Sequence, residues 1–340
     1  MHPMMSTQAL LFFMILLMVS CQGHQPTNIP APDPRVEIFT FDQLFMELTL
    51  DQSGAPWLRS AKFMRNPDPL SSHQPLLNII NKFEGDSLNP IYTDLPNLGS
   101  MAFDRKDQLW AIEAMSLVTV DPDGMDTVYT ASGQINTLLV DIQNNIWITP
   151  TGTGIVRINE DDERIYSVEL SGILSNTVTC SSIDQSNTKW FGHQTSGISR
   201  ISDNGSVHVI EDFITQNLYT LSPGKSSNML AGLGWYNNDT ILVTIGTGAP
   251  ANLSPVLEDA IFPDTKLIVS DIAVDHFSRT WIVVSHVENM ATVKMELYYH
   301  DLDWHKYELL PGEEFIVSLE ANSRLGILYV LTNHTLYRIR

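Results

Sequence analysis

The chain has 340 residues, of which 43% are hydrophobic and 17% are charged, a composition typical of a folded protein and not of a disordered one. Its 19 basic and 39 acidic side chains give a net charge of −20. Because nucleic-acid binding requires clustered basic groups, this charge argues against a nucleic-acid-binding role and equally against direct binding to anionic lipid.

The first 21 residues are a predicted export signal and not part of the fold. Residues 9–19 form an apolar run with the length of a signal-peptide core, too short for a comfortable membrane span. The run ends in Met18-Val19-Ser20-Cys21, which resembles the lipobox of bacterial lipoproteins. That resemblance implies cleavage before Cys21 and acylation of this residue. We therefore expect an exported, lipid-anchored protein of the cell envelope, with an ordinary secreted protein as the alternative.

Two segments separate this signal from the main domain. Residues 22–35 contain four prolines and are predicted to form a stiff, extended tether. Residues 36–83 differ from everything that follows. Their apolar residues are spaced as on a helix face, as in Phe41, Leu44, Phe45 and Leu48. We predict a small cap of helices packed on the main domain, and an irregular extra blade is the alternative.

Residues 84–340 contain a repeated pattern in which an Asp precedes a Trp by six positions. An apolar stretch precedes each Asp, and a loop with a further apolar strand follows each Trp. We interpret the Asp as a turn-stabilising residue and the Trp as a ring packed between neighbouring sheets. A regular calcium site at these Asp residues is the less favoured interpretation. The pattern occurs at Asp104/Trp110, Asp141/Trp147, Asp184/Trp190 and Asp275/Trp281.

The spacing of the repeats predicts a β-propeller. Successive tryptophans lie 37 and 43 residues apart in the first three repeats, close to the roughly 40–50 residues of a four-stranded blade. Two degenerate repeats carry Met229-Leu230 and Tyr329 where the Trp is expected. The sequence therefore predicts an all-β, six-bladed propeller of four-stranded antiparallel blades. Since the last blade lacks an outer strand, we expect residues 89–94 to close the ring by pairing with the C-terminal strands.

The repeats also resemble a known class of propeller. The sequences D-I-Q-N-N-I-W-I-T-P-T-G-T-G-I-V-R-I (141–158) and D-Q-S-N-T-K-W-F-G-H-Q-T-S-G-I-S-R-I (184–201) resemble two-component-regulator propeller repeats, found in periplasmic sensor domains of bacterial hybrid histidine kinases. The resemblance covers about residues 89–340 and implies a surface that reads a ligand or binds a partner. No kinase pattern follows in this sequence, so a sensor role would require a partner protein. A second, weaker resemblance is to virginiamycin B lyase-like and gluconolactonase-like propellers.

Candidate ligand residues come from the loops between the second and third strands of each blade, which project to one face of a propeller. Among them, the adjacent aromatic residues Trp235 and Tyr236 have no counterpart in other blades and are suited to stack on a sugar ring or a partner's side chain. We expect this face to bind a small polar or carbohydrate ligand or a protein partner. The candidate residues are Glu113, Thr151, His193, Gln194, Trp235, Tyr236, His286, Glu288, Asn333 and His334.

Neither a metal nor another cofactor is predicted. His193, His286 and Glu288 have donor atoms suited to a divalent cation, but no local spacing such as H-x-x-x-H supports one. No catalytic residue can be assigned from motifs, so an enzyme is the less favoured interpretation. We expect a binding or interaction module. The alternative is a propeller hydrolase or lyase that uses these three residues at the mouth of the ring.

Overall fold

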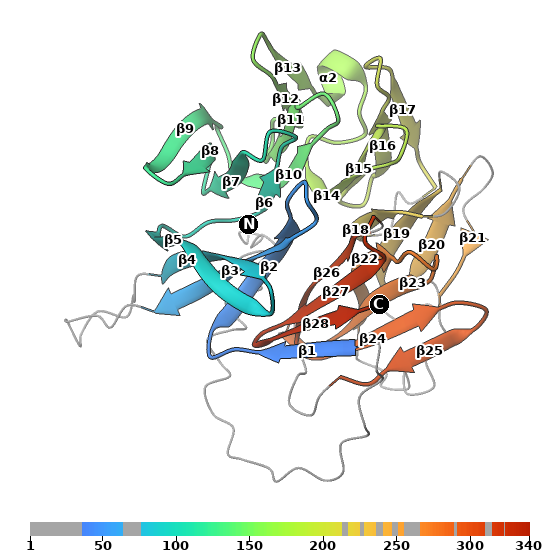
Figure 1. The fold of residues 1–340 in the computed structure, drawn as a ribbon. Helices are drawn as coiled ribbons and strands as arrows, with labels where there is room; N and C mark the ends of the chain where they lie inside the picture. The colour runs from blue at the N-terminus through green and yellow to red at the C-terminus, as the bar shows by residue number, and fades with distance from the viewer. Residues whose placement is uncertain are drawn as a thin grey trace.

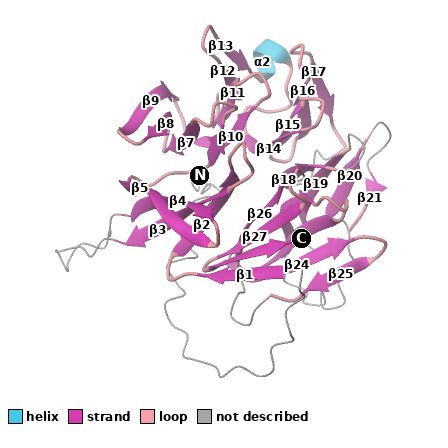
Figure 2. Cartoon of the chain, in the orientation of Figure 1, coloured by secondary structure: helices cyan, strands magenta, loops and turns pink. Residues whose placement is uncertain are grey.

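The computed structural model describes residues 36–63, 76–212, 217–224, 228–235, 241–246, 251–254, 266–288, 291–309, 315–322 and 324–340. Strands arranged around a ring dominate this part of the chain (Figures 1 and 2). Five separate four-stranded sheets and one joined sheet of eight strands together make seven four-stranded blades. The export signal at 1–21, the tether at 22–35 and Tyr236 lie outside the described residues, and their predictions stay predictions.

Each blade has four antiparallel strands, and the first strands of neighbouring blades contact one another all the way around the ring. Blade 1 consists of β2 (Leu44–Leu50), β3 (Pro56–Phe63), β4 (Leu76–Glu84) and β5 (Ser87–Leu95), and blade 2 of β6 (Met101–Phe103), β7 (Leu109–Glu113), β8 (Ser116–Asp121) and β9 (Gly124–Thr130). Blade 3 consists of β10 (Ile135–Val140), β11 (Ile146–Pro150), β12 (Ile155–Ile158) and β13 (Glu163–Tyr166). Blade 4 consists of β14 (Val178–Ile183), β15 (Lys189–His193), β16 (Gly197–Ile201) and β17 (Val207–Ile210).

Blades 5 to 7 complete the ring. Blade 5 consists of β18 (Asn217–Pro223), β19 (Met229–Trp235), β20 (Leu242–Ile245) and β21 (Ala251–Asn252). Blade 6 consists of β22 (Lys266–Val274), β23 (Thr280–Glu288), β24 (Ala291–His300) and β25 (Trp304–Tyr307). Blade 7 consists of β26 (Ile316–Asn322), β27 (Ile327–Thr332), β28 (Thr335–Ile339) and β1 (Val36–Thr40). A short helix, α2 (Val168–Ser171), follows β13. No helix in the described part of the chain is long and apolar enough to cross a membrane.

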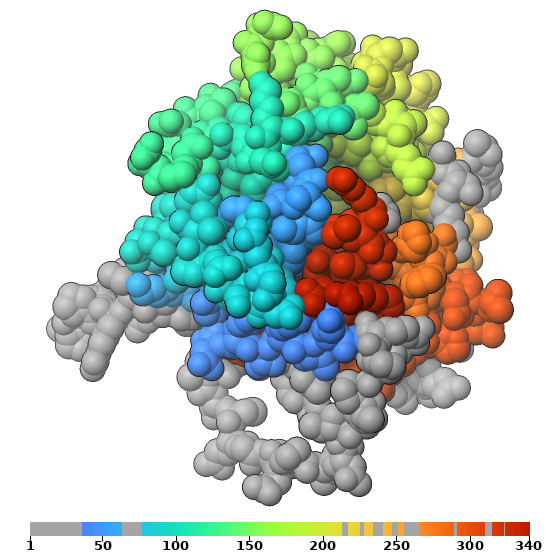
Figure 3. Space-filling view, in the orientation of Figure 1, coloured from blue at the N-terminus to red at the C-terminus, as the bar shows by residue number. Residues whose placement is uncertain are grey.

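The N-terminal strand β1 closes the ring by pairing with β28, from Val36 opposite Ile339 to Thr40 opposite Thr335. Figure 3 shows the N-terminal and C-terminal segments side by side on the molecular surface. The expectation that an earlier segment pairs with the C-terminal strands to close the ring is confirmed, but the predicted segment, residues 89–94, is wrong. Residues 89–94 lie in β5, the outer strand of blade 1.

The predicted six blades and helical cap are also wrong, because residues 44–95 form a complete blade. Blade 1 contains the same Asp and Trp as the other repeats, at Asp51 and Trp57. A β-bulge between Phe45 and Glu47 inserts one residue into β2, so that the buried side chains Phe45 and Leu48 are three positions apart. A bulged strand thus imitates the spacing of a helix face.

The repeated Asp and Trp residues have the structural roles expected of them. In blade 4, Asp184 Oδ1 accepts the backbone N–H groups of Ser186 and Thr188, both at 2.9 Å, while Oδ2 accepts the indole N–H of Trp190 at 2.9 Å. Trp190 packs against Leu218 of blade 5. The indole-to-carboxylate bond recurs at Trp57/Asp51, Trp110/Asp104, Trp147/Asp141 and Trp281/Asp275.

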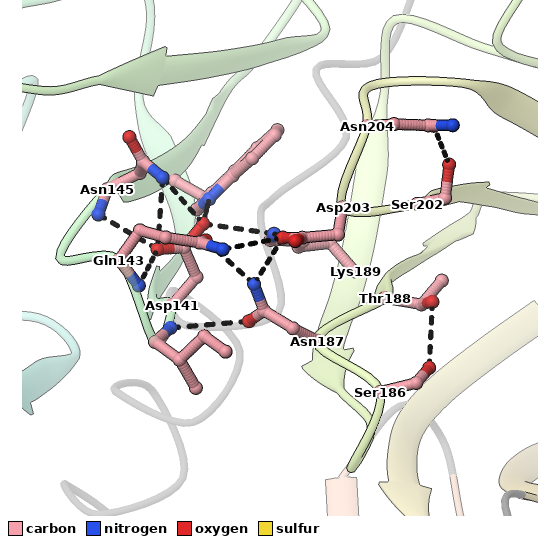
Figure 4. A network of polar contacts seen from close by, with 12 residues as sticks. Asp141, Gln143, Asn145, Ser186, Asn187, Thr188, Lys189, Ser202, Asp203 and Asn204 are labelled. Atoms are coloured by element: carbon pink, nitrogen blue, oxygen red, sulfur yellow. Dashed lines mark hydrogen bonds and ion pairs between the residues drawn. The ribbon is translucent and has the colours of Figure 1, made fainter.

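A polar network joins blades 3 and 4 at the end of the ring that carries these turns (Figure 4). The ammonium group of Lys189, fully buried, lies 3.0 Å from Asp141 Oδ2 and 3.6 Å from Asp203 Oδ1. Asn187 and Gln143 donate side-chain N–H groups to the same Asp203 oxygen at 2.6 and 2.9 Å. A buried charge is stable only with such partners, so this network serves to hold the two blades together.

Candidate functional site

The described candidate residues lie at one end of the ring, because each sits where the second strand of its blade passes into the third. They are distributed over blades 2 to 7. Glu113 ends β7, His193 ends β15, and Glu288 ends β23. The structure therefore brings the predicted residues to one face, and whether they bind a ligand there stays a prediction.

Three of these residues hold loops in place. Thr151 donates its hydroxyl to the carbonyl oxygen of Gln134 at 3.1 Å. The imidazole Nδ1 of His334 lies 2.8 Å from the carbonyl oxygen of Gln43, and the backbone carbonyl of Asn333 accepts the N–H of Phe45 at 2.8 Å. The last two contacts join blade 7 to blade 1, so these residues contribute to ring closure.

His193 is fully buried and pairs with a buried serine. Its Nε2 lies 2.7 Å from Ser199 Oγ, which also accepts the backbone N–H of Leu174 at 3.0 Å. Burial lowers the pKa of His193 to about 4, so the imidazole is neutral at neutral pH. Because both side chains are inaccessible to solvent, this pair holds the connection between blades 3 and 4 and presents no nucleophile to a ligand.

Blades 4 to 6 depart from the symmetry of the ring. Gln194 forms a backbone bridge with Asn217 of β18, which pairs with Gly234 of β19. The next residue, Trp235, pairs with Leu267 of β22, and this pairing joins blades 5 and 6 into one sheet. Leu267 in turn pairs with His286. A continuous backbone ladder therefore connects three candidate residues from three blades, and we call the set Gln194, Asn217, Trp235, Leu267 and His286 the rim.

A buried carboxylate lies beside the rim on blade 6. Glu296 Oε2 contacts His286 Nε2 at 2.8 Å and the Tyr298 hydroxyl at 3.0 Å, while Oε1 contacts the ammonium groups of Lys294 at 2.6 Å and Lys306 at 3.0 Å. The hydrogen bond from His286, followed by those from both lysines and the tyrosine, holds the pKa of Glu296 far below its usual range despite burial. We call these five residues the Glu296 cluster.

The Glu296 cluster was missed at the sequence level, although a signal was present. Lys294, Glu296 and Tyr298 alternate along β24 and therefore share one face of the strand. Lys294 also pairs directly with His286 of β23. This alternation of polar residues on the strand that follows His286 could have predicted a polar face in blade 6.

A second missed group consists of carboxyl groups on three consecutive inner strands. Glu47 of blade 1 accepts the N–H of Met101 at 2.7 Å, and Asp271 of blade 6 accepts the N–H of Leu319 at 2.7 Å, each across to the next blade. Glu320 of blade 7 lies between them. Burial, followed by the charges of Asp271 and Glu47, raises the pKa of Glu320 to about 8. Burial also raises the pKa of Asp271 to about 6.

The three residues considered for metal binding or catalysis have different surroundings. His193 contacts Ser199 in blade 4, whereas His286 contacts Glu296 in blade 6. Glu288 is exposed at the end of β23. In the described residues, no three His, Cys, Asp or Glu side chains are grouped so that they could hold a metal ion. Of these three residues, His286 is therefore the one that the described structure places against a carboxylate, and the three do not form a common site.

No family model matches the chain, and no curated protein matches it in sequence. Solved structures do resemble it. The extracellular domain of the putative hybrid two-component system BT3049 from B. thetaiotaomicron has a TM-score of 0.63 at 14% identity over 91% of this chain, which spans 41% of that domain. A catalytically inactive virginiamycin B lyase from Staphylococcus aureus with quinupristin has a TM-score of 0.62 at 14% identity, covering 90% of this chain and 99% of the lyase.

A third similar structure is YCF48 bound to D1 peptide, with a TM-score of 0.59 at 11% identity over 92% of this chain and 97% of that one. At such identities the likeness concerns the fold. The similar structures thus include extracellular propeller domains, a lyase and a peptide-bound propeller. A propeller fold is compatible with binding and with catalysis, and only the site can separate the two.

Proposed function

We propose that the protein is an exported β-propeller that binds a small ligand or a partner protein at the cell envelope, using the rim of blades 4 to 6. The observation that carries this proposal is the backbone ladder from Gln194 through Trp235 to His286, where the ring loses its symmetry. Repeated residues maintain the ring, so the place where the blades differ is the best candidate for a specific function. Export and acylation at Cys21 belong to the same proposal and are supported by the sequence pattern.

The ligand-binding part is tested with the protein from residue 22 onward, which omits the export signal and the acylation site at Cys21. Native mass spectrometry of the purified protein should identify a co-purifying ligand or partner, and its affinity is then measured for the wild type and for Trp235→Ala. We expect binding to be lost in the variant while the melting temperature is unchanged. Leu302→Ala is the matched control, since Leu302 is 91% exposed and lies in a turn at the opposite end of the ring. Equal affinity of Trp235→Ala and the wild type would remove the rim from the proposal.

A propeller hydrolase or lyase is the second candidate, and the His286–Glu296 pair is the observation that favours it. A carboxylate that orients an imidazole is a common arrangement for general acid–base chemistry. The separate location of His193 argues against the three-residue version. Turnover of a panel of lactones by the wild type, together with its loss in His286→Ala, would support this candidate over simple binding.

A further inference from the structure

Among the described lysines, Lys294 and Lys306 are the two that share one carboxylate, Glu296. Among the other described lysines, Lys62 and Lys106 each have one carboxylate partner, Lys82 and Lys189 each have two, and Lys266 contacts the hydroxyl of Tyr219. Lys294 and Lys306, on neighbouring strands, both contact one oxygen of the buried Glu296, and Lys306 also approaches Glu308 at 3.6 Å. In a protein with a net charge of −20, this is a local concentration of positive charge.

The geometry holds the two ammonium groups close together and accessible. Both contact Glu296 Oε1, so their nitrogen atoms are no more than 5.6 Å apart, the sum of the contact distances of 2.6 and 3.0 Å. The side chains of Lys294 and Lys306 are 48% and 39% exposed. An ammonium group has three donors, so each keeps two beyond the bond to Glu296. Glu308 approaches Lys306 at 3.6 Å, but its side chain is 78% exposed and so contributes little.

Burial of Glu296 makes this arrangement rigid. The carboxylate is only 6% exposed and is fixed on its other oxygen by His286 and Tyr298. Glu296 already bridges the two ammonium groups, and a ligand anion would contact them from their solvent-exposed side. Donors fixed in place before binding lose less entropy when the ligand arrives. The lysine pair therefore has the properties of a preformed site for a carboxylate group.

The location indicates what kind of ligand carries that group. Trp235, Leu267, His286 and Lys294 occupy successive paired positions on four neighbouring strands, a row of about 14 Å at the usual spacing of strands. β22, β23 and β24 each pair on both sides in this sheet. A peptide that adds a strand needs a free edge, which these strands do not offer. Side chains must therefore do the recognition, which suits a chain of sugar rings.

We propose that Lys294 and Lys306 form an anion subsite that binds a carboxylate group of an acidic oligosaccharide lying across the rim. This inference rests on the proposed ligand-binding function and specifies its ligand class. Hydrogen bonds that involve charged groups are each strong enough that losing the subsite should weaken binding by about tenfold to a hundredfold.

The test uses two ligands that differ only in charge, trigalacturonic acid and its methyl ester, in which every carboxylate is blocked. Calorimetric titration is carried out with the wild-type protein, with the double variant Lys294→Gln/Lys306→Gln and with Trp235→Ala. Lys106→Gln is the matched control, because Lys106 is exposed, is paired with Glu160 and follows the repeated Asp104 in a turn at the opposite end of the ring. A melting curve of each variant shows that the ring is intact.

We expect the wild type to bind the acid at least about tenfold more tightly than the ester, and the double variant to bind both equally weakly. Lys106→Gln should behave as the wild type. Equal binding of acid and ester, unchanged binding in the double variant, or binding of triglutamate peptide in preference to the acid would each overturn the inference. If the ester binds and requires Trp235, the ligand-binding function survives and only the anion subsite fails. If neither sugar binds, the inference fails and the native ligand search decides the function.

Discussion

Glu320 provides the sharpest test of how the ring is held together. Its carboxyl group lies on the inner strand of the closing blade, flanked by Asp271 of blade 6 and Glu47 of blade 1. Of these three carboxyl groups, Glu47 is the one with a cation partner in the described part of the chain, Arg59 at 3.0 Å. In the described residues Glu320 has no hydrogen bond or ion pair of its own to stabilise a negative charge. We predict that Glu320→Gln stabilises the protein above neutral pH and has only a small effect, below about 1 kcal/mol, at pH 5.

The sign follows from the direction of the pKa change. Burial raises the pKa of Glu320 from 4.5 to about 8, so the folded state prefers the protonated acid. The stability associated with the bound proton is fully present below pH 4.5 and is lost as the pH rises to about 8. At about 1.4 kcal/mol per pH unit, the cost of ionising this one group reaches roughly 5 kcal/mol. The ionisation of Glu320 is coupled to that of Asp271 and Glu47. We therefore expect the free energy of unfolding of the glutamine variant to exceed that of the wild type by about 3–5 kcal/mol at pH 8.

The measurement is urea unfolding of the wild type and Glu320→Gln at half-unit steps from pH 5 to pH 9. The difference in unfolding free energy between them should grow from below about 1 kcal/mol to its full value across this range. Glu211→Gln is the control, because Glu211 is exposed and should give no such growth. A constant difference between Glu320→Gln and wild type at all these pH values would show that Glu320 is already ionised in the folded protein, and would refute the argument.

Three further predictions concern the ring. Asp184→Asn keeps the size of the side chain but weakens the acceptor for Ser186, Thr188 and Trp190, so chemical denaturation should show a loss of about 1–3 kcal/mol, and an unchanged midpoint would contradict the role of the repeated Asp. Because burial lowers the pKa of His193 from 6.5 to about 4, stability should fall by up to about 3 kcal/mol as the pH drops from 6.5 to 4, and His193→Asn should remove that fall; an equal slope in both proteins would argue against it. Deleting residues 36–40 removes β1 and exposes β28, so the melting temperature should fall and aggregation should rise, whereas an unchanged melting curve would mean that β1 is not needed for closure.

The sequence was sufficient for a propeller of four-stranded blades, but not for the number of blades, because the Asp–Trp pair is visible without any structure. The same pair at Asp51 and Trp57 was overlooked, because the bulge in β2 spaces its buried residues like those of a helix. The position of the candidate residues at one end of the ring followed from their place in the repeat. Contacts such as that between Lys306 and Glu296 could not be predicted, since they depend on how neighbouring strands are aligned.

Equivalent positions in the blades of a repeat protein can be compared with one another, and the differences between blades help to locate a functional site. A residue that recurs at the same place in several blades, such as the Asp that accepts an indole N–H, is explained by a requirement that every blade shares. Blade 5 has Leu230 in place of the Trp, and β19 of that blade pairs with β22 of blade 6. Ring stability does not require this departure, because the other blades are joined through their inner strands without it. The Glu296 cluster lies on the blade that takes part in this departure, and no other carboxylate in the described residues is shared by two lysines, which is why the proposed ligand site is tested there.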